Sequence, residues 1–175
     1  IPYSLKETPV DFDSLTAAGS MMGSGGMIVM DDSDCVVDVG RYFLRFLEEE
    51  SCGKCLPCRL GLTRLREILD NFSKGIGSEQ DITDLTSLAQ AIQDGALCAL
   101  GSSAPNPVLT TIRYFKEEYL AHVRDHKCPA GVCKDLITYS IDPELCTGCM
   151  SCARQCPAQC ITGKKKKPHA IDAEK

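Results

Sequence analysis

The sequence contains no tryptophan and lacks three patterns that would each point to a class of protein. It has no apolar run long enough to span a bilayer and no secretory signal pattern, so we expect no membrane insertion. It has no basic excess, since the net charge is −5, which argues against nucleic acid as the main partner. It also lacks G-x-G-x-x-G, so the MMGSGG run at 21–26 favours a tight turn over a nucleotide site.

Cysteine, in contrast, is abundant, with 12 in 175 residues. In a secreted chain such a number would suggest disulfides. Here the cysteines stand in triplets and pairs separated by two residues, which is a ligand pattern, and we therefore expect a reducing cytoplasm. The chain begins without methionine and ends without an obvious stop, so we expect it to be a fragment.

The stretch ESCGKCLPCRLGL at 50–62 places Cys52, Cys55 and Cys58 at every third position. Three thiolates at this spacing can bind one face of a 4Fe–4S cube and leave one iron for a distant fourth cysteine. Half of a zinc site is the alternative, because Cys-x-x-Cys also suits tetrahedral zinc. Zinc sites usually use two such pairs, so the triplet favours the iron–sulfur cluster.

Helical periodicity dominates the middle of the chain. Apolar stripes predict four amphipathic helices, over about 33–50, 52–75, 78–95 and 106–123, whose stripe residues form a core. Ser78 and Asp81 form a capping-box pattern, and Asn106-Pro107 is typical of a helix start. Short connections predict an antiparallel four-helix bundle in a mainly α protein. Residues 1–31 look like the end of a β-rich domain, with a strand over 26–30.

The bundle topology predicts a fourth cluster ligand. The second helix leads away from the triplet and the third returns, so the residues after the third helix lie beside the triplet. Cys98 is in this position, in the segment LCALGSSAPNP. A buried apolar cysteine is the alternative.

The opposite end of the bundle predicts a second metal site. Cys35 begins the first helix, while His122, Cys128 and Cys133 lie at the end of the fourth helix and just after it. Three cysteines and one histidine are a common structural zinc set. His126 competes with His122 as the nitrogen ligand, and free thiols in a loop remain the alternative to a metal site.

Residues 146–157 match C-x2-C-x2-C-x3-C-P, the bacterial ferredoxin run. Cys146, Cys149 and Cys152 would bind one 4Fe–4S cluster and Cys156 a second, while Cys160 would pack in a strand. The run Lys164–Lys167 is interpreted first as a solvated hairpin tip and second as a contact for an acidic partner.

With these motifs, the chain resembles the C-terminal half of the flavin-bearing, NADH-oxidising subunit of complex I. The quoted segments SGGMIVMDD, ESCGKCLPCR and LCALGSSAPNPV carry the resemblance. The added CPAGVCKDL and ferredoxin run resemble the beta subunit of NAD(H)-linked, often electron-bifurcating, iron-only hydrogenases and related formate dehydrogenases.

The resemblance implies a domain order: the end of a soluble-ligand-binding β-grasp domain at 1–31, a four-helix 4Fe–4S bundle at 32–127, a metal-binding linker or hinge at 128–140, and a partial ferredoxin-like α+β domain at 141–175. It implies FMN and the NAD(H) site in an N-terminal half that the sequence does not contain, so no catalytic residue is named.

The implied function is passage of single electrons from FMN through the clusters to a hydrogenase or formate dehydrogenase subunit, a small 2Fe–2S thioredoxin-like subunit and soluble ferredoxin. A non-bifurcating NADH:acceptor subunit and a zinc-only scaffold are the alternatives.

Overall fold

The computed structural model describes residues 1–172 and divides the chain into two compact units, Ile1–Ile137 and Thr138–Lys175. The described residues are mainly helical with two short strands, as the sequence predicted. Within them, every helix is too short or too polar to cross a membrane. Each unit is described separately below.

The N-terminal segment of the first unit contains a 3-10 helix, η1 (Tyr3–Leu5), and a short helix, α1 (Phe12–Ala17). The strand expected over 26–30 is not formed, and Met27, Ile28 and Val29 are largely exposed. A strand needs a neighbour to pair its backbone groups, and the described residues supply none beside this segment. The preceding run does contain a turn, closed by the hydrogen bond from Gly25 N–H to the Met22 carbonyl.

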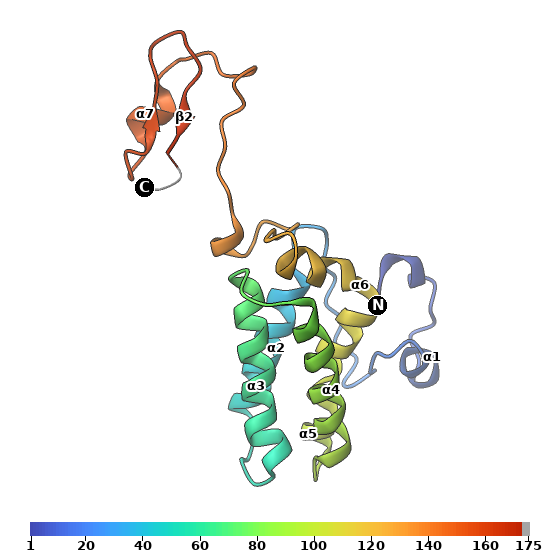
Figure 1. Ribbon diagram of the computed structural model, residues 1–175. Coiled ribbons are helices and arrows are strands. Elements are labelled where there is room, and N and C mark those ends of the chain that lie inside the picture. The colour runs from blue at the N-terminus through green and yellow to red at the C-terminus, as the bar shows by residue number, and fades with distance from the viewer. Residues whose placement is uncertain (173–175) are drawn as a thin grey trace. The chain divides into compact units, whose positions relative to one another are not determined.

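Four long helices make up most of the first unit (Figure 1). They are α2 (Val36–Glu49), α3 (Leu56–Ser73), α4 (Glu79–Gly95) and α6 (Asn106–Val123), with a short α5 (Ala99–Ser103) between the last two and η2 (Lys134–Leu136) after them. The predicted capping box at Ser78 and Asp81 begins α4. The sequence did not predict α5.

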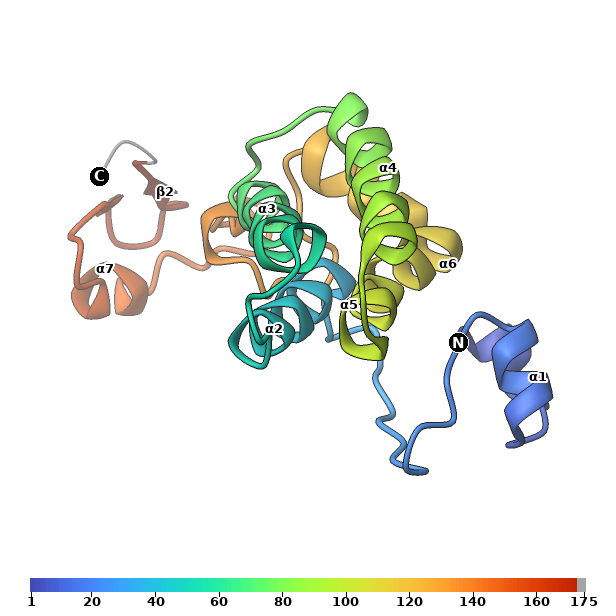
Figure 2. The same cartoon turned by 90° about the horizontal axis from the view of Figure 1, so that it is seen from below.

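The long helices pack pairwise, α2 and α4 each against α3 and α6 (Figure 2). Neighbours in sequence run in opposite directions. Glu48 near the end of α2 binds Thr63 and Arg66 of α3. Ile92 near the end of α4 lies against Gly61 near the start of α3, so closely that a β-carbon there would require Ile92 to move. The start of α3 and the end of α4 are therefore neighbours.

The core of this unit lies between the four helices. Leu62, Leu65 and Leu69 of α3 are fully buried, as the apolar stripe predicted. The stripe on α2 differs, because Leu44 is buried while Phe46 is 51% exposed. The 14 residues of α2 place Phe46 on the outer side of the helix, two positions past Leu44, which is a rotation of about 200° at 3.6 residues per turn.

The second unit consists of α7 (Ser151–Gln155) and a two-stranded antiparallel sheet, β1 (Ile161–Thr162) with β2 (Ala170–Ile171). Ile161 pairs with Ile171, and the turn between the strands contains the lysine run. The cysteines of the ferredoxin run lie before, within and after α7.

Candidate metal centres

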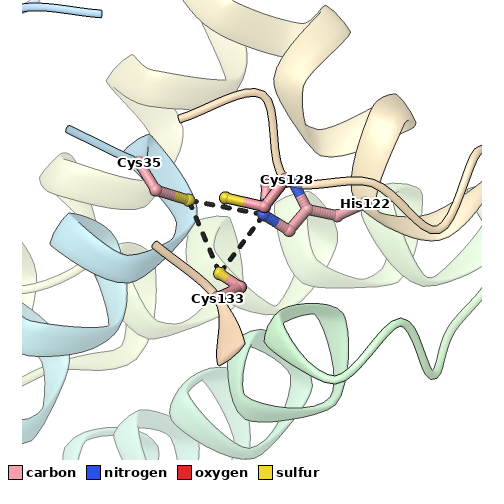
Figure 3. A group of neighbouring side chains, drawn as sticks. All are labelled: Cys35, His122, Cys128 and Cys133. Carbon is pink, nitrogen blue, oxygen red and sulfur yellow. Dashed lines mark hydrogen bonds between the residues drawn. The ribbon is translucent and has the colours of Figure 1, made fainter. Parts of the chain in front are cut away.

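Four buried side chains of the first unit converge on one point (Figure 3). The ligand atoms of Cys35, His122, Cys128 and Cys133 all lie within 4.8 Å of one another. His122 Nε2 is 3.3 Å from Cys35 Sγ and 3.4 Å from Cys133 Sγ, and the two sulfurs are 3.8 Å apart. No other group in the described residues brings three or more potential ligand atoms this close together.

The helix ends position these side chains. Cys35 is the residue immediately before α2, His122 lies in the last turn of α6, and Cys128 and Cys133 follow in the loop that leads to η2. His126 is outside the group, since it is exposed and its Nδ1 lies 2.9 Å from the Gly75 carbonyl. Of the two histidines considered from the sequence, the structure therefore brings His122 to the cysteines.

The dimensions of the group suit a zinc ion. Zinc bonds of about 2.3 Å to sulfur and about 2.0 Å to nitrogen give a tetrahedron with edges of about 3.8 Å between sulfurs and about 3.5 Å between sulfur and nitrogen. The three distances above agree with these values. His122 Nδ1–H donates to the Glu118 carbonyl at 2.7 Å, which leaves Nε2 free to bind a metal.

The electrostatics of the group separate its charges. The hydrogen bond from Cys133, together with His122, lowers the pKa of Cys35 to about 4, while the pKa of Cys133 is raised by the same contact and by burial. Burial acts to lower the pKa of His122, but the Cys35 sulfur and the Glu118 carbonyl outweigh it and raise that pKa to about 9. In the absence of a metal, the group thus contains a thiolate–imidazolium pair.

The cysteine triplet lies at the start of α3. Cys55 is the residue immediately before the helix, Cys58 is buried in its first turns, and Cys52 is exposed in the preceding loop. The N-terminus of an 18-residue helix carries a partial positive charge that favours bound anions. An anionic iron–sulfur cluster is one such group.

The segment containing Cys98 approaches the triplet. The backbone N–H groups of Leu97 and Cys58 point at the Cys55 sulfur and lower the pKa of that thiol. Gly101, in α5, lies so close to Cys58 that a β-carbon would be 3.6 Å from its sulfur. Cys98 itself is exposed at the start of α5. The turn after α4 thus places Cys98 in the region where the topology predicted it.

Sequence reasoning missed one contact at the triplet. The Ser51 hydroxyl lies 3.2 Å from Cys58 Sγ, and its oxygen also accepts from the Gly53 N–H at 3.2 Å. When Cys58 is a thiolate, the hydroxyl must be the donor. A serine directly before a cysteine motif is the only signal in the sequence.

In the second unit, Cys146 and Cys149 lie in a loop before α7, Cys152 lies within α7 and Cys156 directly follows it. Cys149 is exposed and the other three are half-buried. Cys160 does not lie within a strand but directly before β1, and its sulfur is 3.5 Å from that of Cys156.

His169 is a second residue that the sequence did not reveal. It is 4% exposed, its backbone N–H donates to Cys146 Sγ at 3.4 Å, and its Nε2 lies 3.1 Å from the sulfur of Met150. The hairpin places it against the cysteine loop from a position 23 residues away. A lone histidine near a strand gives no signal of that contact.

Comparison with known proteins agrees with this arrangement of cysteines. Residues 38–122 match the NADH-ubiquinone oxidoreductase-F iron–sulfur binding region, and residues 139–162 match a 4Fe–4S binding domain. The first match contains the triplet and Cys98, and the second contains the whole ferredoxin run. The chain therefore combines an iron–sulfur binding region of the NADH-ubiquinone oxidoreductase-F type with a 4Fe–4S binding domain.

Two curated relatives narrow the assignment. The chain is 55% identical over 163 residues to the NADP-reducing hydrogenase subunit HndC of Solidesulfovibrio fructosivorans, covering 93% of this chain and 33% of that protein. It is 41% identical over 129 residues to the F 2 subunit of the NADH-quinone oxidoreductase of Rhizobium meliloti (strain 1021), covering 74% of this chain and 31% of that one. The chain thus spans about a third of the length of these relatives, and it is homologous to both.

Among solved structures, the chain is similar to an NAD+-reducing [NiFe]-hydrogenase in the H2-reduced state, with a TM-score of 0.53 and 29% identity. That likeness covers 75% of this chain and 22% of the other. The resemblance inferred from the cysteine motifs, to a complex I subunit and its hydrogenase counterpart, is confirmed by these relatives.

Proposed function

We propose that this chain conducts single electrons in a flavoprotein subunit that oxidises NADH, through 4Fe–4S clusters, to a partner hydrogenase subunit. The observation that carries the proposal is the match of residues 38–122 to the NADH-ubiquinone oxidoreductase-F iron–sulfur binding region, which contains Cys52, Cys55, Cys58 and Cys98. The contact between the Leu97 segment and Cys55 supports Cys98 as the fourth ligand.

The triplet and Cys98 would hold the first cluster, in the four-helix bundle. A 4Fe–4S cluster supplies one-electron chemistry when it is bound. The residues of this chain would set its reduction potential: the N-terminus of α3 and the Leu97 N–H favour the more negative, reduced state, and so does the Ser51 hydroxyl on Cys58.

The ferredoxin-like segment would hold a second cluster through Cys146, Cys149 and Cys152, with Cys156 a ligand to another. The 4Fe–4S domain match over 139–162 supports the iron–sulfur role. The backbone N–H of His169 would donate to the Cys146 ligand there.

Zinc is the metal we propose for Cys35, His122, Cys128 and Cys133. Spacing, burial and the histidine hydrogen bond to Glu118 support it. The site would be structural, since four protein ligands leave no open coordination position, and it would anchor the linker at 128–140 that precedes the ferredoxin-like segment.

The remaining parts of the proposal rest on the relatives. HndC is a subunit of an NADP-reducing hydrogenase, which favours a hydrogenase partner over a formate dehydrogenase. FMN, NAD(H), a small 2Fe–2S subunit, electron bifurcation with soluble ferredoxin, the β-grasp identity of 1–31 and a cytoplasmic location are carried over from the family resemblance.

The test is paramagnetic resonance spectroscopy of the complete protein with its copurifying subunits, reduced by NADH under anaerobic conditions. We expect 4Fe–4S signals, of which Cys98→Ser alters or removes one while Cys160→Ser alters none assigned to the bundle. A protein that contains zinc but neither iron nor such a signal would overturn the electron-transfer function. Ferredoxin reduction that requires both NADH and hydrogen would support bifurcation.

A further inference from the structure

The lysine turn of the second unit lies directly on the loop that holds the ferredoxin cysteines. Lys166 N–H donates to the Gly148 carbonyl at 3.0 Å, and Lys167 N–H closes the turn onto the Lys164 carbonyl at 3.0 Å. Gly148 lies between Cys146 and Cys149, and a side chain at this position would collide with the backbone of Lys166 and Lys167. The lysine backbone and the cysteine loop are therefore packed as one surface.

The four lysine side chains of this turn, 164–167, are all exposed. Within the described part of the chain, no ion pair joins any of them to a carboxylate. Residues 138–172 carry five basic side chains and three carboxylates, in a protein whose net charge is −5. The acidic chain thus displays a local positive patch at the cysteine loop.

Like charges on four successive residues repel one another, and the described residues provide no ion-pair partner to offset this. A solvated turn needs no more than one or two such residues for solubility. A cationic patch instead attracts anionic partners and steers their encounter.

We propose that Lys164–Lys167, the lysine patch, is the docking surface for an acidic protein that carries single electrons to or from the cluster of Cys146, Cys149 and Cys152. The inference rests on the proposed function, because it requires a cluster at those cysteines. The position of the patch favours this partner over an anionic membrane or a nucleic acid. A partner bound at Lys166 is held beside the ligand loop itself, and electron transfer between proteins requires such proximity. One electron leaves the reduced carrier and the cluster of this chain gains it.

The test uses the complete protein with its copurifying subunits and an acidic two-cluster bacterial ferredoxin as the probe. The second-order rate constant for electron transfer from the reduced ferredoxin is measured by stopped-flow between about 0.01 M and 1 M salt, over which the screening length falls from about 30 Å to about 3 Å. We expect the rate constant to fall at least about tenfold with salt, as for electrostatically steered association.

The double variant Lys165→Gln with Lys167→Gln removes two charges and keeps the Lys166 backbone contact. We expect it to be slower by about tenfold at low salt and to lose most of the salt dependence. The control, Lys74→Gln with Lys116→Gln, changes the net charge equally at exposed positions of the first unit and should keep the original rate constant. Equal rate constants in the two variants would overturn the docking surface.

Iron content and the NADH-reduced spectrum are recorded for every variant. If the patch variant loses its cluster, the lysines are structural and the proposal is overturned. If the unsubstituted protein shows no 4Fe–4S signal, the proposed function fails as well; if the signal is present and the transfer is insensitive to the patch, only the docking surface fails. Binding to phosphatidylserine vesicles that the patch variant loses, with ferredoxin transfer unaffected, would assign the lysines to a membrane instead.

Discussion

Ser51 shows how a single hydroxyl can act on a cluster ligand without binding iron. It lies 3.2 Å from Cys58 Sγ, and hydrogen bonds to the ligand sulfurs help to set the reduction potential of a cluster. We expect Ser51→Ala to make the potential of the bundle cluster more negative by about 20–60 mV, since about 59 mV is a tenfold change for one electron. A redox titration followed by paramagnetic resonance measures it. Ser102→Ala, whose hydroxyl binds the Ala99 carbonyl instead, is the control. An unchanged potential in Ser51→Ala would rule out the contact.

The protonation of the four-residue group predicts how zinc affinity depends on pH. Without metal, His122 holds its proton up to about pH 9 and Cys133, with its raised pKa, holds one as well. Zinc requires neutral histidine and thiolates, so binding releases both protons. Each released proton increases the affinity tenfold per pH unit. We therefore expect the apparent affinity to rise by at least about tenfold per unit from about pH 6 to pH 8, measured by competition with a chelator. A pH-independent affinity would contradict the assigned protonation.

Several site residues could be predicted from the sequence because their spacing has a direct chemical meaning. Cysteines three apart suggested a shared cluster, and helix direction placed Cys98 near them. Ser51 and His169 could not be predicted, since each acts through a contact that only the folded chain creates. The same holds for the two histidines, His122 and His126, which lie four residues apart and differ only in where α6 ends.

At the scale of elements, the end of α3 depends on Gly75. Its φ is +70°, and a β-carbon would lie 2.6 Å from Leu136 and 3.2 Å from His126. We expect Gly75→Ala to cost about 2 kcal/mol, from the left-handed conformation and the close contact together, which corresponds to about 4–8 °C in the midpoint of thermal unfolding for a chain of this size. Gly25→Ala has a similar φ of +86° with nothing within 4 Å, so it should lower the midpoint much less. Equal shifts would show that the contact with Leu136 is unimportant.

The long helices could be predicted because periodicity and caps are local. The observed helices α3 and α4 begin and end within a few residues of the expected positions. The strand over 26–30 was wrong for a physical reason: β-structure depends on a partner, and none of the described residues provides it. Helix α5 is five residues long, too short for an apolar period to be recognised.

At the scale of the whole molecule, the four-residue group joins parts of the first unit that are far apart in sequence, with Cys35 and Cys133 separated by 98 positions. We expect His122→Ala to lose zinc and to unfold at a temperature several degrees lower, because the metal fixes the start of α2 to the loop after α6. Metal analysis and thermal unfolding measure both effects. His126→Ala, which changes a histidine outside the group, should retain zinc. Loss of zinc in both variants, or in neither, would contradict the assignment.

The central claim is that one chain holds iron at one set of cysteines and zinc at another. Anomalous diffraction at the iron and zinc absorption edges locates each metal in the same crystal of the complete protein. The account predicts iron-edge density at Cys52, Cys55, Cys58 and Cys98 and at the ferredoxin cysteines, with zinc-edge density alone at Cys35, His122, Cys128 and Cys133. Zinc at the triplet, or iron at the histidine-containing group, would contradict it.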